Sequence, residues 1–107
     1  MIVTTSESVA GYRITKVLGL VKGNTIRAKN IGEDIIATIK NITGGEIEEY
    51  TRMIAESREQ ALDRMLEDAA RLGANAVIAT RFETTSAMSG AAEILAYGTA
   101  VTLEAIS

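Results

Sequence analysis

The hydrophobic and polar residues of this chain recur with two different periods, which predict strands and helices. From Tyr12 onward the residues alternate with a period of two, which is typical of a β-strand, and both faces carry apolar side chains. A short β-prone stretch precedes this strand at residues 2–4. Gly23 and Asn24 interrupt the pattern, and either a tight hairpin turn or a kink in one long strand fits them. One face would carry Tyr12, Ile14, Lys16, Leu18 and Leu20, and the other Arg13, Thr15, Val17, Gly19 and Val21.

A period of three to four residues then predicts two helices. The first covers residues 30–44, with Asn30 as its N-cap and Gly44 as its terminator. Its inward stripe comprises Ile31, Ile35, Ile39 and Ile42. The second and longer helix covers about residues 46–72, and its apolar stripe comprises Ile47, Tyr50, Ile54, Ala61, Met65, Ala69 and Leu72.

Two further strands follow the long helix. Gly73 stands where a left-handed C-terminal cap is expected, and from Ala76 the period returns to two. Ser89 and Gly90 mark a chain reversal into the last strand. The first of these strands would place Ala76, Ile78, Thr80 and Phe82 on one face and Val77, Ala79, Arg81 and Glu83 on the other. The last strand would place Leu95, Tyr97, Val101 and Leu103 opposite Ile94, Ala96, Gly98, Ala100 and Thr102.

Composition narrows the class of protein. A chain of 107 residues without a linker or repeat is expected to form a single domain over residues 1–107. The net charge of -3 offers no basic face for nucleic acid or anionic lipid, so neither is an expected partner. The N-terminal sequence lacks the pattern of a signal peptide, and no segment has the apolar length of a membrane span. These features predict a cytoplasmic protein.

The residues available for metal binding and catalysis are few, because the chain contains neither cysteine nor histidine. Soft metals and structural zinc need thiolate or imidazole ligands, so we expect no stoichiometric zinc or copper and no metal site. The four methionines, Met1, Met53, Met65 and Met88, are better explained by core packing. Carboxylates at Glu46, Glu48 and Glu49 could hold a hard cation, but their place at a helix start is already explained by the helix dipole.

One group of residues remains as a candidate site. Arg81 and Glu83 share a strand face, and Tyr97 and Thr99 lie across the predicted hairpin. This group could bind an anion through the guanidinium, but an ion pair across a subunit interface explains it better, because no activated nucleophile accompanies it. We expect no catalytic residues and no cofactor.

Several short motifs, taken together, resemble a known family. They are MIVTT, GYRITKVLG, IRAKNIGEDI, the pattern YxR…A from Tyr50 to Ala61, LGANAVIATRFE from Leu72, and YGTAVTL near the end. Across nearly the whole chain they resemble the YbjQ-like family of uncharacterised bacterial and archaeal proteins, also described as heavy-metal-binding domains. The resemblance implies an α+β fold similar to a dodecin subunit, with a β-α-β-β antiparallel sheet packed on one long and one shorter helix. It also implies a ring-shaped homopentamer.

The residues themselves predict some oligomer. Amphipathic helices can cover one face of a small sheet, yet apolar residues are expected on both faces. The second face would contain Val17, Val21, Val77, Ile94 and Ile106, with Ala79, Ala96, Gly98 and Ala100 small enough for close approach. We therefore predict an oligomeric binding or scaffold protein without catalytic machinery, with any small ligand at a subunit junction. The alternative is a small-molecule enzyme acting on an anionic ligand, with Arg81 as anion clamp and Glu83 as base.

Overall fold

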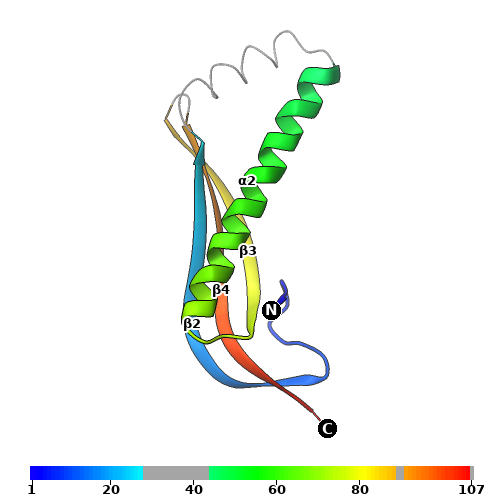
Figure 1. Cartoon of the computed structure of the whole chain (residues 1–107), viewed down its shortest axis with the longest axis vertical. Helices are drawn as coiled ribbons and strands as arrows, with labels where there is room; N and C mark the ends of the chain where they lie inside the picture. Colours follow the sequence, from blue (N-terminus) through cyan, green and yellow to red (C-terminus); the bar gives the residue numbers. More distant parts are fainter. Residues whose placement is uncertain (28–43, 89–90, 107) are drawn as a thin grey trace.

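The chain forms an α+β fold in which one long helix packs on a four-stranded sheet (Figure 1). A computed structural model describes residues 1–27, 44–88 and 91–106. The elements are β1 (Ile2–Val3), β2 (Tyr12–Arg27), α2 (Gly44–Arg71), β3 (Ala76–Met88) and β4 (Ala91–Ala105). Most of the predicted helix over residues 30–44 and the predicted reversal at Ser89 and Gly90 lie outside the described residues. No helix in the described ranges is long and apolar enough to cross a membrane.

The sheet is mixed, with strand order β1-β3-β4-β2. β4 pairs antiparallel with both β2 and β3, whereas β1 pairs parallel with β3. The expectation of a purely antiparallel sheet was therefore wrong, because the short N-terminal strand adds to the outer edge of β3 in the same direction. The chain from β1 then turns back toward β2, where the main-chain nitrogen of Tyr12 donates to the carbonyl of Val9.

β2 is one continuous strand through Gly23, so the hairpin alternative is excluded. The glycine is required by the crossing helix. A Cβ added at this position would lie 2.3 Å from both the Ala61 carbonyl oxygen and the Met65 nitrogen of α2. Two α2 side chains also reach the main chain of β2 beside this glycine. Arg64 donates to the Asn24 carbonyl, and Asp68 accepts a hydrogen bond from the Lys22 nitrogen.

The long helix runs close to its predicted bounds, although it begins at Gly44, the residue predicted to terminate the preceding helix. The predicted stripe holds in the second half of α2, where Ala61, Met65 and Ala69 are fully buried. Leu72 lies beyond the helix end and is 46% exposed, so its place in the stripe was wrong. The side chains of Ile47 and Tyr50 lie outside the described residues.

The predicted left-handed cap at Gly73 is confirmed by its φ of 82°. The nitrogen of Gly73 donates to the Ala70 carbonyl and that of Ala74 to the Ala69 carbonyl, which together form a Schellman motif. This cap ends α2 and directs the chain into β3 within a few residues.

The core lies between α2 and the sheet, and it contains residues that the period-two pattern assigned to the opposite face. Its buried members are Val21, Ala61, Met65, Ala69, Val77, Ile94, Ala96 and Ala100. The prediction that Val21, Val77 and Ile94 lie opposite the helix was therefore wrong. Ala96 and Ala100 are small because α2 packs over them rather than because sheets of two subunits approach there.

What was wrong is which face of the sheet α2 covers; irregular pairing within β2 moves two further side chains, Val17 and Leu18, from their predicted faces. The register of β2 with β4 shifts between Ile14 and Lys16 and again between Val17 and Gly19. Each shift inserts a residue and moves the following side chains to the other face. Val17 and Leu20, predicted on opposite faces, consequently pair with Val101 and Thr99 on one face, while Leu18 packs against the helix-side core.

We call the side of the sheet away from α2 the open face. At one end it is covered by Ile2 and Val9, which pack on a second buried cluster of Ala76, Ile78, Val101 and Leu103. Beyond this cover the open face exposes large apolar side chains of β2. Val17 is 63% exposed, Leu20 69% and Ile26 62%.

A candidate site on the open face

The candidate residues meet on the open face in a row that crosses three strands. Tyr97 of β4 stands directly opposite Arg81 of β3 on one side and Lys22 of β2 on the other. In the next row Leu95 of β4 stands between Glu83 and Asn24. Direct cross-strand neighbours on one face have Cβ atoms about 4.5–5.5 Å apart, so these side chains lie within reach of one another.

A bulge in β3 turns Arg81 and Glu83 toward this face. Ile78 pairs with Thr99 and Arg81 with Tyr97, so Ala79 and Thr80 together stand opposite the single residue Gly98. The prediction that the two charged residues share a face with Val77 was wrong, because the bulge flips them to the side of Ile78.

The bulge carries backbone strain. Ala79 has a φ of 53°, a left-handed backbone conformation that residues other than glycine rarely adopt. The hydroxyl of Thr80 is buried and has no hydrogen-bond partner among the described residues. Both features cost free energy, on the order of 1–3 kcal/mol each. Strained residues of this kind occur often at functional sites, where a side chain must be held in one position.

The N-terminal segment holds this bulge in place through hydrogen bonds. The nitrogens of Ala79 and Thr80 donate to the carbonyls of Ser6 and Thr4, at 2.8 and 3.0 Å. Nη1 of Arg81 donates to the carbonyls of Thr5 at 2.9 Å and Thr80 at 2.8 Å. The guanidinium is therefore fixed at the edge of the open face by main-chain contacts.

Tyr97 and Glu83 form the one side-chain hydrogen bond between the four predicted site residues in the described part of the chain, with the phenol donating to Oε1 at 3.2 Å. Arg81 lies opposite Tyr97 in the register but makes no ion pair with Glu83 there. Thr99 lies one row away, between Leu20 and Ile78. The structure thus brings Arg81, Glu83 and Tyr97 together and leaves Thr99 at their border.

Substitution of Glu83 should lower the pKa of Tyr97. Partial burial of the phenol raises this pKa above its usual 10.0, and the Glu83 charge and hydrogen bond raise it further, whereas Arg81 lowers it. Glu83→Gln should therefore bring the pKa down, and Arg81→Gln should raise it. Ultraviolet titration of the phenolate, with Tyr12 and Tyr50 replaced by phenylalanine, measures both shifts.

The same raised pKa fixes the direction of a stability effect. The fold favours the neutral phenol, so this contribution to stability is fully present below about pH 10 and is lost as the pH rises through the higher folded-state pKa. As the pH rises above 10, the free energy of unfolding should fall less in Glu83→Gln than in the unmodified chain. An equal loss in both would contradict the assignment of Glu83 as a cause.

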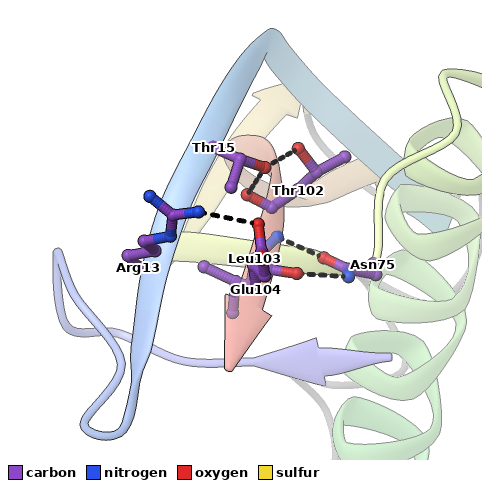
Figure 2. A network of polar contacts seen from close by, with 6 residues as sticks. All are labelled: Arg13, Thr15, Asn75, Thr102, Leu103 and Glu104. Atoms are coloured by element: carbon purple, nitrogen blue, oxygen red, sulfur yellow. Dashed lines mark hydrogen bonds and ion pairs between the residues drawn. The ribbon is translucent and has the colours of Figure 1, made fainter. Parts of the chain in front are cut away.

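A second polar network, at the other end of the sheet, has a structural role (Figure 2). Asn75 pairs through its side chain with the main chain of Leu103, accepting from the nitrogen at 2.7 Å and donating to the carbonyl at 2.9 Å. Arg13 forms an ion pair with Glu104 at 3.0 Å, and the hydroxyls of Thr15 and Thr102 lie 2.7 Å apart. This network was not predicted from the sequence, although an asparagine between a helix cap and a strand is a suggestive signal.

The donor atoms do not fit a heavy-metal site. The full sequence has no cysteine or histidine, and among the described residues no three acidic side chains cluster as a metal site would require. The side chains of Glu46, Glu48 and Glu49 lie outside the described residues. What the open face offers instead is two cations beside a phenol, which suits binding of an anion better than coordination of a cation.

Comparison with known proteins identifies the relatives of this chain. Residues 1–104 match the YbjQ family, described as "Putative heavy-metal-binding". The UPF0145 protein of Dehalococcoides mccartyi strain BAV1 is 60% identical over 104 residues, covering 97% of this chain and 100% of that protein. A UPF0145 protein of Thermus thermophilus is 56% identical over 104 residues, covering 97% of this chain and 91% of that protein.

A solved structure supports the fold. A crystal structure of a protein of unknown function from Pediococcus pentosaceus, assigned to the DUF74 family, aligns with a TM-score of 0.63 and 18% identity. The alignment covers 97% of this chain and 98% of that one, so the similarity extends over the whole fold. The match of the family profile and the identities to its members agree with the motifs at both ends of the sequence: the chain belongs to the YbjQ family, UPF0145.

Proposed function

We propose that this protein is a non-enzymatic binding or scaffold protein that assembles into a homo-oligomer through its open face. The observation that carries this proposal is the exposure of Val17, Leu20 and Ile26 on the side of β2 away from the helix. Large apolar side chains gathered on one sheet face mark an interaction surface more often than a free one.

The shape of the subunit supports an interface. Its Cα radius of gyration is 17.2 Å, whereas a compact chain of this length would have about 13 Å. Its shortest extent is 17 Å, which leaves room for the sheet and one covering layer. A second copy would supply the missing layer. The family resemblance suggests five subunits in a closed ring, in which each contact is heterologous.

The enzyme alternative has less support from the geometry. The carboxylate of Glu83, its proposed base, accepts a hydrogen bond from Tyr97, and the full sequence contains no cysteine or histidine. A cytoplasmic location is part of the same proposal and agrees with a chain that has no cysteine for disulfides.

Substitution of Leu20 tests the assembly. Leu20→Lys should dissociate the oligomer, because a lysine placed in an apolar contact weakens it by about 3 kcal/mol, roughly a hundredfold in the dissociation constant. Light scattering coupled to size exclusion, at micromolar concentration, measures the mass. Leu72→Lys is the matched control, since Leu72 is also exposed but lies past the end of α2.

The outcomes separate the two parts of the proposal. A stable monomer for the unmodified chain would refute assembly through the open face. An oligomer with another number of subunits would refute only the pentamer.

A further inference from the structure

We propose that Lys22 and Arg81, on either side of Tyr97, form a binding site for a small organic oxyanion, a carboxylate or phosphate ester with an apolar body. The inference rests on the proposed binding function and names the class of ligand. It adds Lys22, which was not among the residues predicted from the sequence, to the candidate site.

The charges of the row favour an anion. The ion pairs within the described ranges involve Arg13 and Arg71, and neither Lys22 nor Arg81 has a carboxylate oxygen of a described residue within 4.0 Å. The two exposed cations on opposite sides of Tyr97 are therefore not ion-paired within these parts of the chain, and the carboxylate beside them, Glu83, is hydrogen-bonded to Tyr97. Strands are about 4.8 Å apart, so both long side chains can converge on a group above β4.

The arginine is held in place before any ligand arrives. Nη1 is engaged by the carbonyls of Thr5 and Thr80, while Nη2 and Nε make no hydrogen bond to any described residue. A guanidinium fixed on one side and free on the other loses little conformational entropy on binding an oxyanion. Two nitrogens in a planar fork match the two oxygens of a carboxylate or phosphate.

The strained bulge gives a second and independent reason. Without it, the alternation of β3 would turn Arg81 and Glu83 away from Tyr97 and toward the helix side. This placement destabilises the fold in two ways. Ala79 has a positive φ, and the buried hydroxyl of Thr80 has no partner among the described residues. Bulges that reorient a side chain occur preferentially at functional sites.

The surroundings indicate the rest of the ligand. Tyr97 lies between the two cations and Leu95 in the next row, and both are half-buried, so an apolar surface adjoins the cations. Glu83 carries a negative charge beside Tyr97 and disfavours a second anionic group there. A ligand with one anionic end and an apolar or aromatic body satisfies both features.

Titration with phenyl phosphate and with benzoate, at constant ionic strength and followed by ligand-observed NMR, tests the site. We expect at least one probe to bind with a dissociation constant of about 1 mM or lower, and inorganic phosphate to bind more weakly because it lacks the apolar body. The better phenyl probe distinguishes a phosphate ligand from a carboxylate ligand.

Three variants assign the binding to these residues. Lys22→Gln and Arg81→Gln should each weaken binding about tenfold or more, since each removes a charge-assisted contact. Arg13→Gln, which removes an arginine already paired with Glu104, should leave binding unchanged. Arg81→Gln also removes the contacts to Thr5 and Thr80, so Lys22→Gln, whose side chain has no such contact in the described structure, is the decisive variant.

Two results would overturn the site. Full affinity in Lys22→Gln, or no binding of either phenyl probe by the unmodified chain at about 10 mM, contradicts it. Light scattering on the same samples keeps the two proposals apart. An intact oligomer without binding refutes the anion site alone, and a monomer that binds the probe refutes the oligomer alone.

Discussion

Replacing Gly23 with alanine is expected to be among the most damaging single changes in this protein. The added Cβ would lie 2.3 Å from two main-chain atoms of α2, the Ala61 oxygen and the Met65 nitrogen. A helix backbone cannot move aside as a flexible side chain can, so α2 must shift away from the buried residues beneath it. We expect a loss of at least about 3 kcal/mol in the free energy of unfolding.

Chemical denaturation measures this loss, and Gly11→Ala is the matched control. Gly11 also has no side chain and has a positive φ of 82°, but apart from its two chain neighbours nothing lies within 4 Å of the position of an added Cβ. Its replacement should cost only the backbone strain, about 1–2 kcal/mol. Equal losses at both positions would show that the crossing of α2 over β2 is not what requires Gly23.

Asn75→Asp should produce the second large loss of stability. Asn75 uses both its oxygen and its nitrogen to pair with the main chain of Leu103, a residue only 8% exposed. Aspartate keeps the acceptor, but it places a negative oxygen against the Leu103 carbonyl and leaves that carbonyl without its donor. The expected cost is about 2–3 kcal/mol.

Asn24→Asp provides the comparison, because it makes the same chemical change in an asparagine that bonds an exposed side chain rather than the main chain of a buried residue. Asn24 donates to Glu93 at 2.8 Å, and water screens the repulsion between the new aspartate and Glu93. We expect Asn24→Asp to lower the free energy of unfolding by less than about 1 kcal/mol. Thermal denaturation of both variants measures the two losses of stability. A larger loss in Asn24→Asp than in Asn75→Asp would contradict the role of Asn75.

Local signals explain which parts of the fold could be predicted. The stripe of α2 and the cap at Gly73 depend on residues within one or two turns, so the sequence was sufficient to find them. The function of Gly23 depends on a helix that crosses from a distant part of the chain. A glycine followed by asparagine is indistinguishable, in sequence alone, from a turn.

The face of the charged residues in β3 could not be predicted, because it depends on a bulge. The bulge at Ala79 and Thr80 is stabilised by main-chain groups of the N-terminal segment. Nothing within β3 itself signals the extra residue. One missed bulge inverts every side chain that follows it, which is why the pattern grouped Arg81 with Val77.

The candidate site was partly predictable for the same reason. Arg81 and Glu83 are two residues apart beyond the bulge, so they keep a common face whichever way the strand is turned, and Tyr97 follows from the hairpin. Lys22 comes from a strand whose register contains two shifts. Its position opposite Tyr97 emerges only once the pairing of β2 with β4 is known.

The strand order has a consequence for how the chain folds during synthesis. Within the described sheet β2 pairs with β4 alone, and α2 and β3 both lie between these strands in the sequence. A ribosome releases β2 long before β4, so the nascent chain must hold a strand of 16 residues without its partner. Closing so long a loop is slow, and an unpaired apolar strand invites intermolecular pairing in the meantime. The basic residues along β2, Arg13, Lys16, Lys22 and Arg27, are of the kind that protect such a strand against aggregation.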